Sequence, residues 1–249
     1  MSNSVDAAAA RAVFVHGAGA GGWEWDIWRR VFAAHGWDCH APDLMPAAIG
    51  LAATRLEDYV AQVRAWCAAG APSPVLVGAS LGGLLALLAA ADVLPKALVL
   101  INPIVPAAFG TPAAQDCPAI IPWASARSLH GTQRALPDAD AAAILLAWRR
   151  WRDESGAVVN AARAGVAAES PRCPTLVMAS AHDDAAPAAA SAAMAAAFGA
   201  EFMSLPHASH VGPLLGRSAS ACAAAALAWL SRASAWSRSI QIPFAQNLD

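Results

Sequence analysis

The sequence has few charged residues and no apolar run long enough to cross a membrane. Charged residues make up 14% of the 249 positions, against 57% hydrophobic ones. The longest apolar stretch near the middle of the chain is broken by Asp92, Pro95 and Lys96, whereas a spanning helix needs about 20 apolar residues. Much of the apolar fraction is alanine in helical patterns, where alanine is the strongest helix former. We therefore expect no membrane association.

The sequence also lacks an excess of positive charge, a paired cysteine motif and a secretory signal. A net charge of −2 leaves no basic surface for nucleic acid. The five cysteines are scattered, without C-x-x-C spacing, which is typical of reduced packing residues. No charged segment followed by an apolar core is found at the N-terminus. These features predict a cytoplasmic protein whose partner is a small molecule.

One stretch combines a strand, a sharp corner and a helix. Residues 75–85 read Val-Leu-Val-Gly-Ala-Ser-Leu-Gly-Gly-Leu-Leu, so Ser80 lies between Gly78 and Gly82 in a G-x-S-x-G pattern. Glycines at these positions allow a strand and a helix to approach closely around a strained serine. The helix N-terminus there also favours developing negative charge. Ser80 is therefore the candidate nucleophile, and the alternative is an ordinary strand-to-helix turn.

The first predicted strand covers residues 12–15, and a second glycine-rich loop follows it. Gly17, Gly19 and Gly22 satisfy the letters of the dinucleotide-binding pattern G-x-G-x-x-G. That function also requires an acidic residue about twenty positions further on, and Asp43 is available for it. Dinucleotide binding therefore stays open as an alternative, although it gives no role to Ser80.

Strands and helices alternate along most of the chain. The apolar patterns predict strands near residues 12–15, 39–41, 75–79, 97–101, 175–179 and 201–205. Helices are expected between them, at residues 23–34, 56–68, 82–91, after 187, and from 210 to about 231. This alternation is typical of an α/β protein with a mainly parallel sheet of about six strands flanked by helices.

The alternation stops between residues 104 and 172, which we interpret as a small, mainly helical cap insertion with one clear helix at Asp138–Glu154. Residues 1–103 and 173–232 then form the two parts of the core. Trp123, Trp148 and Trp151 are candidates for an apolar substrate pocket, and the alternative is that they form the insertion's own small core. We expect core positions for two of the three.

The last residues, 233–249, form a separate tail. Residues 236–249 carry Ile240, Ile242 and Phe244 in a strand-like alternation. No strand position remains for them in the predicted sheet, so we expect the tail to dock on its own domain or on a second subunit of a homodimer. The alternative is disorder.

Chemically active residues follow the predicted strands in a specific order. Ser80 comes after the third strand, Asp183 and Asp184 after the fifth, and His207 and His210 after the sixth. In a parallel sheet these positions meet at the carboxyl edge. The order serine, acid, histidine is that of α/β-hydrolases. The chain resembles this family from about residue 12 to 231, and the glycine-rich loop resembles its compact methylesterase and hydroxynitrile lyase branch.

The resemblance implies a catalytic triad of Ser80, Asp183 and His210. Asp183 is preferred because its spacing to Pro187 matches the acid loop of the family, and Asp184 is the alternative. His210 is preferred to His207 because the base of the family follows a small residue. The sequence departs from the family at two positions where glycine is usual, namely Ser180 and Ser209.

The resemblance also implies an oxyanion hole formed by the backbone N–H groups of Leu81 and Ala18, with no cofactor. His16, in the same loop as Ala18, is interpreted as a residue that shapes the loop. A metal site is the alternative interpretation of five residues near the acid and the base, but these five contain neither an H-E-x-x-H motif nor a group of cysteines. These residues are His182, Asp183, Asp184, His207 and His210.

Together these features predict a serine hydrolase that cleaves a small, largely apolar ester, lactone or thioester. Relatives that cleave cyanohydrins carry a lysine after the catalytic histidine, whereas Val211 follows His210 and the only lysine is Lys96. A dehalogenase would need a carboxylate in place of Ser80. Two alternatives remain, a ligand-binding protein with an idle triad and a hydrolase of C–C bonds.

Overall fold

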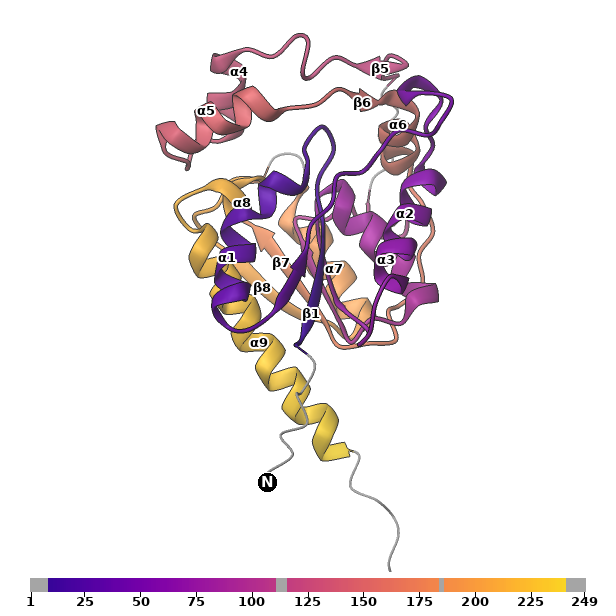
Figure 1. Cartoon of the computed structure of the whole chain (residues 1–249), viewed down its shortest axis with the longest axis vertical. Helices are drawn as coiled ribbons and strands as arrows, with labels where there is room; N and C mark the ends of the chain where they lie inside the picture. Colours follow the sequence, from indigo (N-terminus) through magenta and orange to yellow (C-terminus); the bar gives the residue numbers. More distant parts are fainter. Residues whose placement is uncertain (1–8, 111–115, 184–185, 241–249) are drawn as a thin grey trace, which may run out of the picture.

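The core of the protein is a six-stranded parallel sheet. The structure, a computed structural model, describes residues 9–110, 116–183 and 186–240, with side chains as far as Ala233. The sheet has the order β2-β1-β3-β4-β7-β8. Its strands are β1 (Arg11–Val15), β2 (Asp38–His40), β3 (Val75–Ala79), β4 (Ala97–Ile101), β7 (Thr175–Ser180) and β8 (Glu201–Leu205). The predicted fold class is therefore confirmed (Figure 1).

Helices cover both faces of this sheet, which explains why the inner strands are buried along their whole length. Every residue of β1, β3, β4 and β7 is buried, as expected for strands without a solvent-facing side. One face packs against α1 (Asp26–Ala34), α8 (Gly212–Leu215) and α9 (Ala219–Ile240). The other packs against α2 (Leu56–Ala68), α3 (Leu81–Val93) and α7 (Ala188–Phe198). All strand ends that carry candidate residues therefore meet at one edge.

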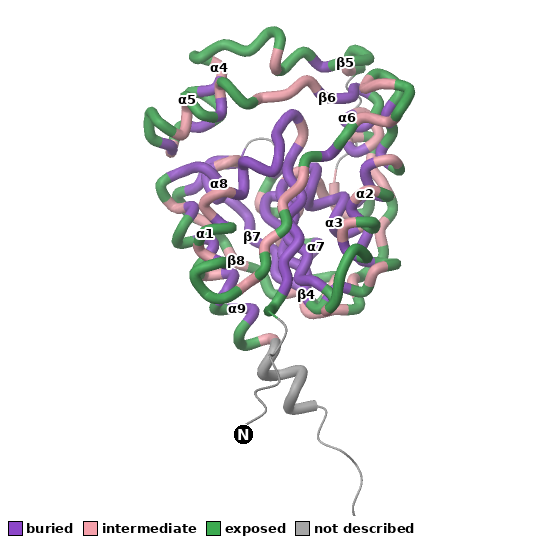
Figure 2. The backbone as a smooth tube through the Cα atoms, viewed as in Figure 1, coloured by how far each residue is buried: buried purple, intermediate pink, exposed green. Residues whose placement is uncertain are grey.

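The cap lies over the carboxyl edge of the sheet (Figure 1). It contains α4 (Leu129–Ala135), α5 (Ala141–Arg150), α6 (Gly156–Ala164) and a two-stranded antiparallel sheet of β5 (Ile120–Ile121) and β6 (Glu154–Ser155). The cap backbone is mostly exposed or half-buried, whereas the strands beneath it are buried (Figure 2). The N–H of Ala107 donates to the carbonyl of Val166, so the two ends of the cap lie side by side.

The cap is also where the predicted elements differ most from the structure. The helix predicted at Asp138–Glu154 begins only at Ala141, after an Asp140 N-cap, and ends at Arg150. Beyond it the chain is extended because the Arg152 N–H donates to the carbonyl of Gly19, and Glu154 then pairs with Ile121. A two-residue strand carries no readable periodicity, so this small sheet was not predicted.

The C-terminal helix is longer than predicted. Helix α9 continues to Ile240, so the expected end near Ser231 and the domain boundary at 232/233 fall inside it. In Figure 1 its last turns project away from the sheet. Residues 241–249 lie outside the described part, so docking of the tail, and a dimer through it, stay predictions. None of the helices in the described ranges has the length and apolar character needed to span a bilayer.

Candidate active site

Ser80 occupies the predicted corner between β3 and α3. Its backbone has φ 55° and ψ −121°, a strained conformation for a residue with a side chain. The flanking glycines are sterically required, since a Cβ on Gly78 would lie 2.2 Å from the Gly82 carbonyl oxygen. A Cβ on Gly82 would lie 2.2 Å from the carbonyl oxygen of Val15. The close packing of β1, β3 and α3 therefore fixes the position of the serine.

A continuous chain of hydrogen bonds joins Ser80, His210 and Asp183. The Nε2 atom of His210 lies 2.9 Å from Ser80 Oγ, and its Nδ1 atom lies 2.6 Å from Asp183 Oδ2. The other oxygen of Asp183 accepts the N–H of Ala186 at 2.9 Å, and its carboxylate is fully buried. A carboxylate acceptor at Nδ1 places the proton there and leaves Nε2 free to accept the Ser80 proton. His207 is exposed, and Asp184 lies outside the described residues.

Ala18 and Leu81 line the same cavity as Ser80. Leu81 is the first residue of α3, where backbone N–H groups have no partner inside the helix. Neither N–H donates a hydrogen bond to any residue that the structure describes. An oxyanion hole formed by these two N–H groups stays a prediction.

Three carboxylates of the protein itself occupy backbone N–H groups of the glycine-rich loop. The three bonds run from Gly17 to Glu24 at 3.1 Å, from Gly19 to Glu154 at 3.0 Å and from Gly22 to Asp43 at 2.7 Å. Donors that already hold carboxylates are not free to bind a pyrophosphate. The acidic residue needed for a ribose, Asp43, is likewise part of the loop structure. The geometry thus argues against dinucleotide binding.

His16 shapes this loop, as its position predicted. Its Nε2 atom accepts the N–H of Leu44 at 2.8 Å, so Nδ1 carries the proton and donates to the carbonyl of Gly17 at 2.8 Å. Burial lowers the pKa of His16 to about 4. The ring is therefore neutral near pH 7, with both nitrogen atoms used in holding the loop.

Ser180 and Ser209, the two serines at positions where the family usually has glycine, both form side-chain hydrogen bonds. Ser180 Oγ accepts Nδ2 of Asn102 at 2.8 Å, and the same Nδ2 donates to the carbonyl of His210 at 2.7 Å. Ser209 Oγ donates to Asp138 Oδ1 at 2.6 Å, and its N–H donates to Asp138 Oδ2 at 2.9 Å. Both serines therefore help to hold the loop that carries His210. No role was predicted for Asn102 or Asp138, because their partners are distant in the sequence.

Ser80 and His210 open into a cavity of about 1380 Å³ between the sheet edge and the cap. Trp123 and Trp151 line this cavity, and the Trp151 Nε1 donates to Thr132 Oγ1 at 3.1 Å. Trp148 is the exception among the three predicted pocket residues and does not line the cavity. Its ring instead lies 5.9 Å from the guanidinium carbon of Arg127, which does line the cavity. The cavity wall is otherwise mainly apolar.

Glu24 is a further polar group in this cavity wall, and the sequence did not reveal it. The residue is only 4% exposed and lies in η1, the 3-10 turn at Gly22–Trp25. Burial raises the pKa of its carboxyl to about 7. A single acidic residue between Trp23 and Trp25, in a segment that packs on the sheet, is the sequence signal that could have indicated it.

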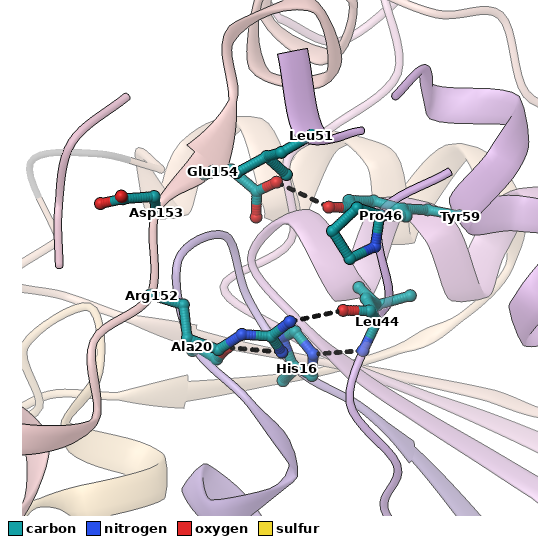
Figure 3. Close-up of a pocket in the computed structure, with 9 residues that line it drawn as sticks. All are labelled: His16, Ala20, Leu44, Pro46, Leu51, Tyr59, Arg152, Asp153 and Glu154. Carbon is teal, nitrogen blue, oxygen red and sulfur yellow. Dashed lines mark hydrogen bonds between the residues drawn. The ribbon is translucent and has the colours of Figure 1, made fainter. Parts of the chain in front are cut away.

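A smaller pocket of about 180 Å³ lies where the cap meets the glycine-rich loop (Figure 3). The Arg152 guanidinium donates to the carbonyl of Leu44 at 2.9 Å, and Tyr59 Oη donates to Glu154 Oε1 at 2.9 Å. Glu154 Oε2 accepts the Gly19 N–H. These polar groups are satisfied by one another, so the pocket serves as a joint between cap and loop. No three metal-binding side chains converge anywhere in the described ranges.

Comparison with known proteins agrees with this geometry. Residues 12–225 match the model of the alpha/beta hydrolase family. Among solved structures, a pyrethroid hydrolase from Sphingobium faniae JZ-2 is 22% identical with a TM-score of 0.69, and the match covers 91% of this chain and 98% of that one.

Two further structures have the same fold. Polyneuridine aldehyde esterase is 18% identical over 86% of this chain and 98% of its own, with a TM-score of 0.63. Tomato methylketone synthase I is 15% identical over 90% and 99%, with a TM-score of 0.70. A search among curated proteins finds no match. Since the family match spans most of the sequence, this chain belongs to the alpha/beta hydrolase family.

Proposed function

We propose that the protein is a serine hydrolase that cleaves a carboxylic ester, lactone or thioester through an acyl-enzyme on Ser80. The observation that carries this proposal is the unbroken hydrogen-bond chain from Ser80 Oγ through His210 to Asp183. Two of the structural neighbours are named as an esterase and a pyrethroid hydrolase, which supports ester chemistry. No cofactor is required for this reaction.

The proposed mechanism gives each residue a separate role. As Ser80 Oγ forms a bond to the acyl carbon, its proton passes to Nε2 of His210, and Asp183 stabilises the resulting imidazolium. The N–H groups of Ala18 and Leu81 hold the oxyanion, and one such donor contributes about 10²- to 10³-fold in rate. The proton on His210 then leaves with the alcohol, and a water molecule releases the acid by the same steps.

The substrate that the cavity favours is larger than the small ester expected from the sequence. Binding pockets for small molecules usually span about 300 to 1000 Å³, whereas this cavity reaches about 1380 Å³. Its lining is mainly apolar, with alanine the most frequent residue, and three arginines also border it, namely Arg127, Arg134 and Arg163. We therefore propose an apolar ester with at least one bulky or extended group.

The direct test combines labelling and turnover. A fluorophosphonate probe should label Ser80 of the native protein, and Ser80→Ala should abolish labelling and reduce ester turnover by about 10⁴-fold or more. The exposed Ser170, replaced by alanine, is the control and should change neither. Labelling at another residue, or near-native turnover by Ser80→Ala, would refute the proposal.

A second candidate function is a non-ester reaction on the same triad, such as hydrolysis of a C–C bond. It is favoured by the similarity to methylketone synthase, whose solved structure contains 2-tridecanone. Rapid labelling of Ser80 by the fluorophosphonate probe, together with no turnover of any ester in a broad panel, would support this candidate. Slow labelling with tight retention of an apolar ligand would instead support a binding protein with an idle triad.

We also propose a cytoplasmic location, because all five cysteines are free thiols and burial raises the pKa of Cys67 and Cys39 to about 11. Thiols with raised pKa values form little reactive thiolate, which suits packing residues in a reducing compartment. Fractionation of the producing cell would test this proposal.

A further inference from the structure

The proposed mechanism leaves one buried acidic group in the catalytic cavity without a role. Glu24 lines the same cavity as Ser80 and His210 and is 4% exposed. Its neighbours Trp23 and Trp25 belong to the hydrophobic core. A carboxyl group is costly to bury in such surroundings unless its oxygen atoms find partners.

Only one of the two Glu24 oxygen atoms has a partner in the described part of the chain. Oε2 accepts the Gly17 N–H at 3.1 Å, and no described donor bonds to Oε1. A Cβ placed on Gly17 would lie 3.4 Å from Ser80 Cβ and 3.8 Å from Glu24 Oε2, so the carboxyl and the nucleophile border the same side of that residue. The remaining oxygen is therefore the one available to a molecule in the cavity.

The protonation state of Glu24 determines what this oxygen offers. Burial raises the pKa to about 7, and the Gly17 N–H and the nearby His210 oppose that shift. Below this pH the group is a neutral carboxylic acid, which donates one hydrogen bond, whereas the ionised group only accepts. Because Oε2 already accepts from Gly17, the proton of the neutral form belongs on Oε1.

We propose that Glu24 is a specificity-determining residue, whose Oε1–H group donates a hydrogen bond to an oxygen of the substrate beside the scissile carbonyl. The preferred substrates are then esters that carry a second oxygen acceptor close to that carbonyl, such as an ether, a ketone or a second ester group. This inference rests on the proposed ester hydrolysis. A site built to bond a substrate oxygen discriminates strongly against an analogue that lacks it.

The test uses matched ester pairs that differ by one oxygen atom. Methyl methoxyacetate and methyl butanoate have nearly the same shape, and longer pairs follow the same design. The kcat/KM ratio within each pair is measured for the native protein and for Glu24→Gln, Glu24→Leu and the exposed control Glu57→Gln. Comparing ratios between variants removes the difference in intrinsic reactivity of the two esters.

We expect Glu24→Leu to lower the ratio by about 10-fold or more, because the substrate oxygen then has no hydrogen-bond partner at this position. Glu24→Gln should keep the preference, since its amide also donates, and should make it independent of pH. In the native protein the preference should decline as the pH rises through about 7. Glu57→Gln should behave as the native protein does, because Glu57 is exposed on α2.

Two outcomes would overturn the inference while leaving ester hydrolysis intact. An unchanged ratio in Glu24→Leu, with both esters slowed equally, would show that the residue only positions the loop. A preference for esters with an ammonium group would show that the ionised form binds the substrate. If Glu24→Leu does not fold, the pH profile of Glu24→Gln decides. Absence of turnover with every pair, together with no labelling of Ser80, would refute both proposals.

Discussion

The sheet edge and the cap contribute to the candidate site in different ways. The sheet edge provides the ionisable groups, and the side chains that hold them are buried, as Asp183 and Asn102 show. The cap provides aromatic surface on short elements, where Trp123 is 38% exposed and Leu145 is 40% exposed. Reactive atoms are thus held by a rigid core, whereas the shape of the substrate space depends on weakly buried residues.

Asp138 is the exception to this division. It belongs to the cap, yet both of its carboxylate oxygens bind Ser209, the residue next to His210. The cap therefore also helps to position the base. Four predictions test how far the division between a rigid core and an adaptable cap extends.

The largest expected effect comes from glycine substitution in the core. A Cβ on Gly82 would lie 2.2 and 2.4 Å from the carbonyl oxygens of Val15 and His16, which cannot move without disrupting β1. We expect Gly82→Ala to lower the free energy of unfolding by about 3 kcal/mol or more, or to prevent folding. In the cap, a Cβ on Gly131 would meet only Ser128 Oγ, so Gly131→Ala should change stability by about 1 kcal/mol or less. Denaturant unfolding compares the two, and equal effects would contradict the division.

The next effect is the pH dependence of stability, set by two buried groups of the core. The pKa of His16 falls from 6.5 to about 4 on folding, so the unfolded chain binds that proton first and stability is lost as the pH falls through this window. The pKa of Glu24 rises from 4.5 to about 7, so the native state binds that proton first and stability is gained as the pH falls. These two contributions oppose each other over most of the same range.

Substitution of Glu24 should leave the pH dependence of stability that His16 alone causes. We expect Glu24→Gln to become less stable by about 2 kcal/mol between pH 6.5 and 4, relative to the change in the native protein over the same interval. Denaturant unfolding at several pH values measures this difference. The exposed control Glu57→Gln should follow the native curve, and a parallel curve for Glu24→Gln would contradict the opposite signs of the two shifts.

Substitution of Asp138 should reduce turnover without disrupting the core. Asp138→Ala removes both hydrogen bonds to Ser209, and a displacement of about 1 Å in a catalytic group costs about 100-fold in rate. We expect a 10- to 100-fold loss in kcat and slower labelling of Ser80. Asp140→Ala is the matched control, because Asp140 caps α5 through Ala143 and has no bond to the His210 loop. Equal turnover in the two variants would show that the cap does not position the base.

The smallest expected effect distinguishes the cap tryptophans. Trp123→Ala should raise KM for a bulky apolar ester by about 10-fold, because the residue lines the cavity and the substrate loses apolar contact there. Trp148→Ala should change KM less, since Trp148 does not line the cavity and contacts it only through Arg127. Steady-state kinetics with short and long esters measures both, and a larger effect from Trp148→Ala would reverse the assignment.

The core was predictable because its signals are local. Helix α2 and strands β3, β4 and β8 have the predicted bounds, since apolar runs and helical spacing determine them over a few residues. The positions of Ser80, Asp183 and His210 follow from the chain order at one sheet edge. Asp138 lies 71 residues from Ser209, and Glu154 lies 135 residues from Gly19. Such contacts depend on the folded cap, and no local sequence pattern predicts them.

The hydrogen bond from the Ala107 N–H to the Val166 carbonyl, which brings the two ends of the cap together, has a consequence for protein engineering. A segment that leaves and re-enters its host at one point is suited to transplantation between relatives, because the host backbone need not change. Here, however, the N–H and the carbonyl of Gly19 are both bonded to cap residues, Glu154 and Arg152. A chimera that replaced Glu154 would lose the side-chain bond to the Gly19 N–H, whereas the bond from the backbone N–H of position 152 survives substitution. The unit to exchange is therefore residues 108–165, with a glutamate kept at position 154.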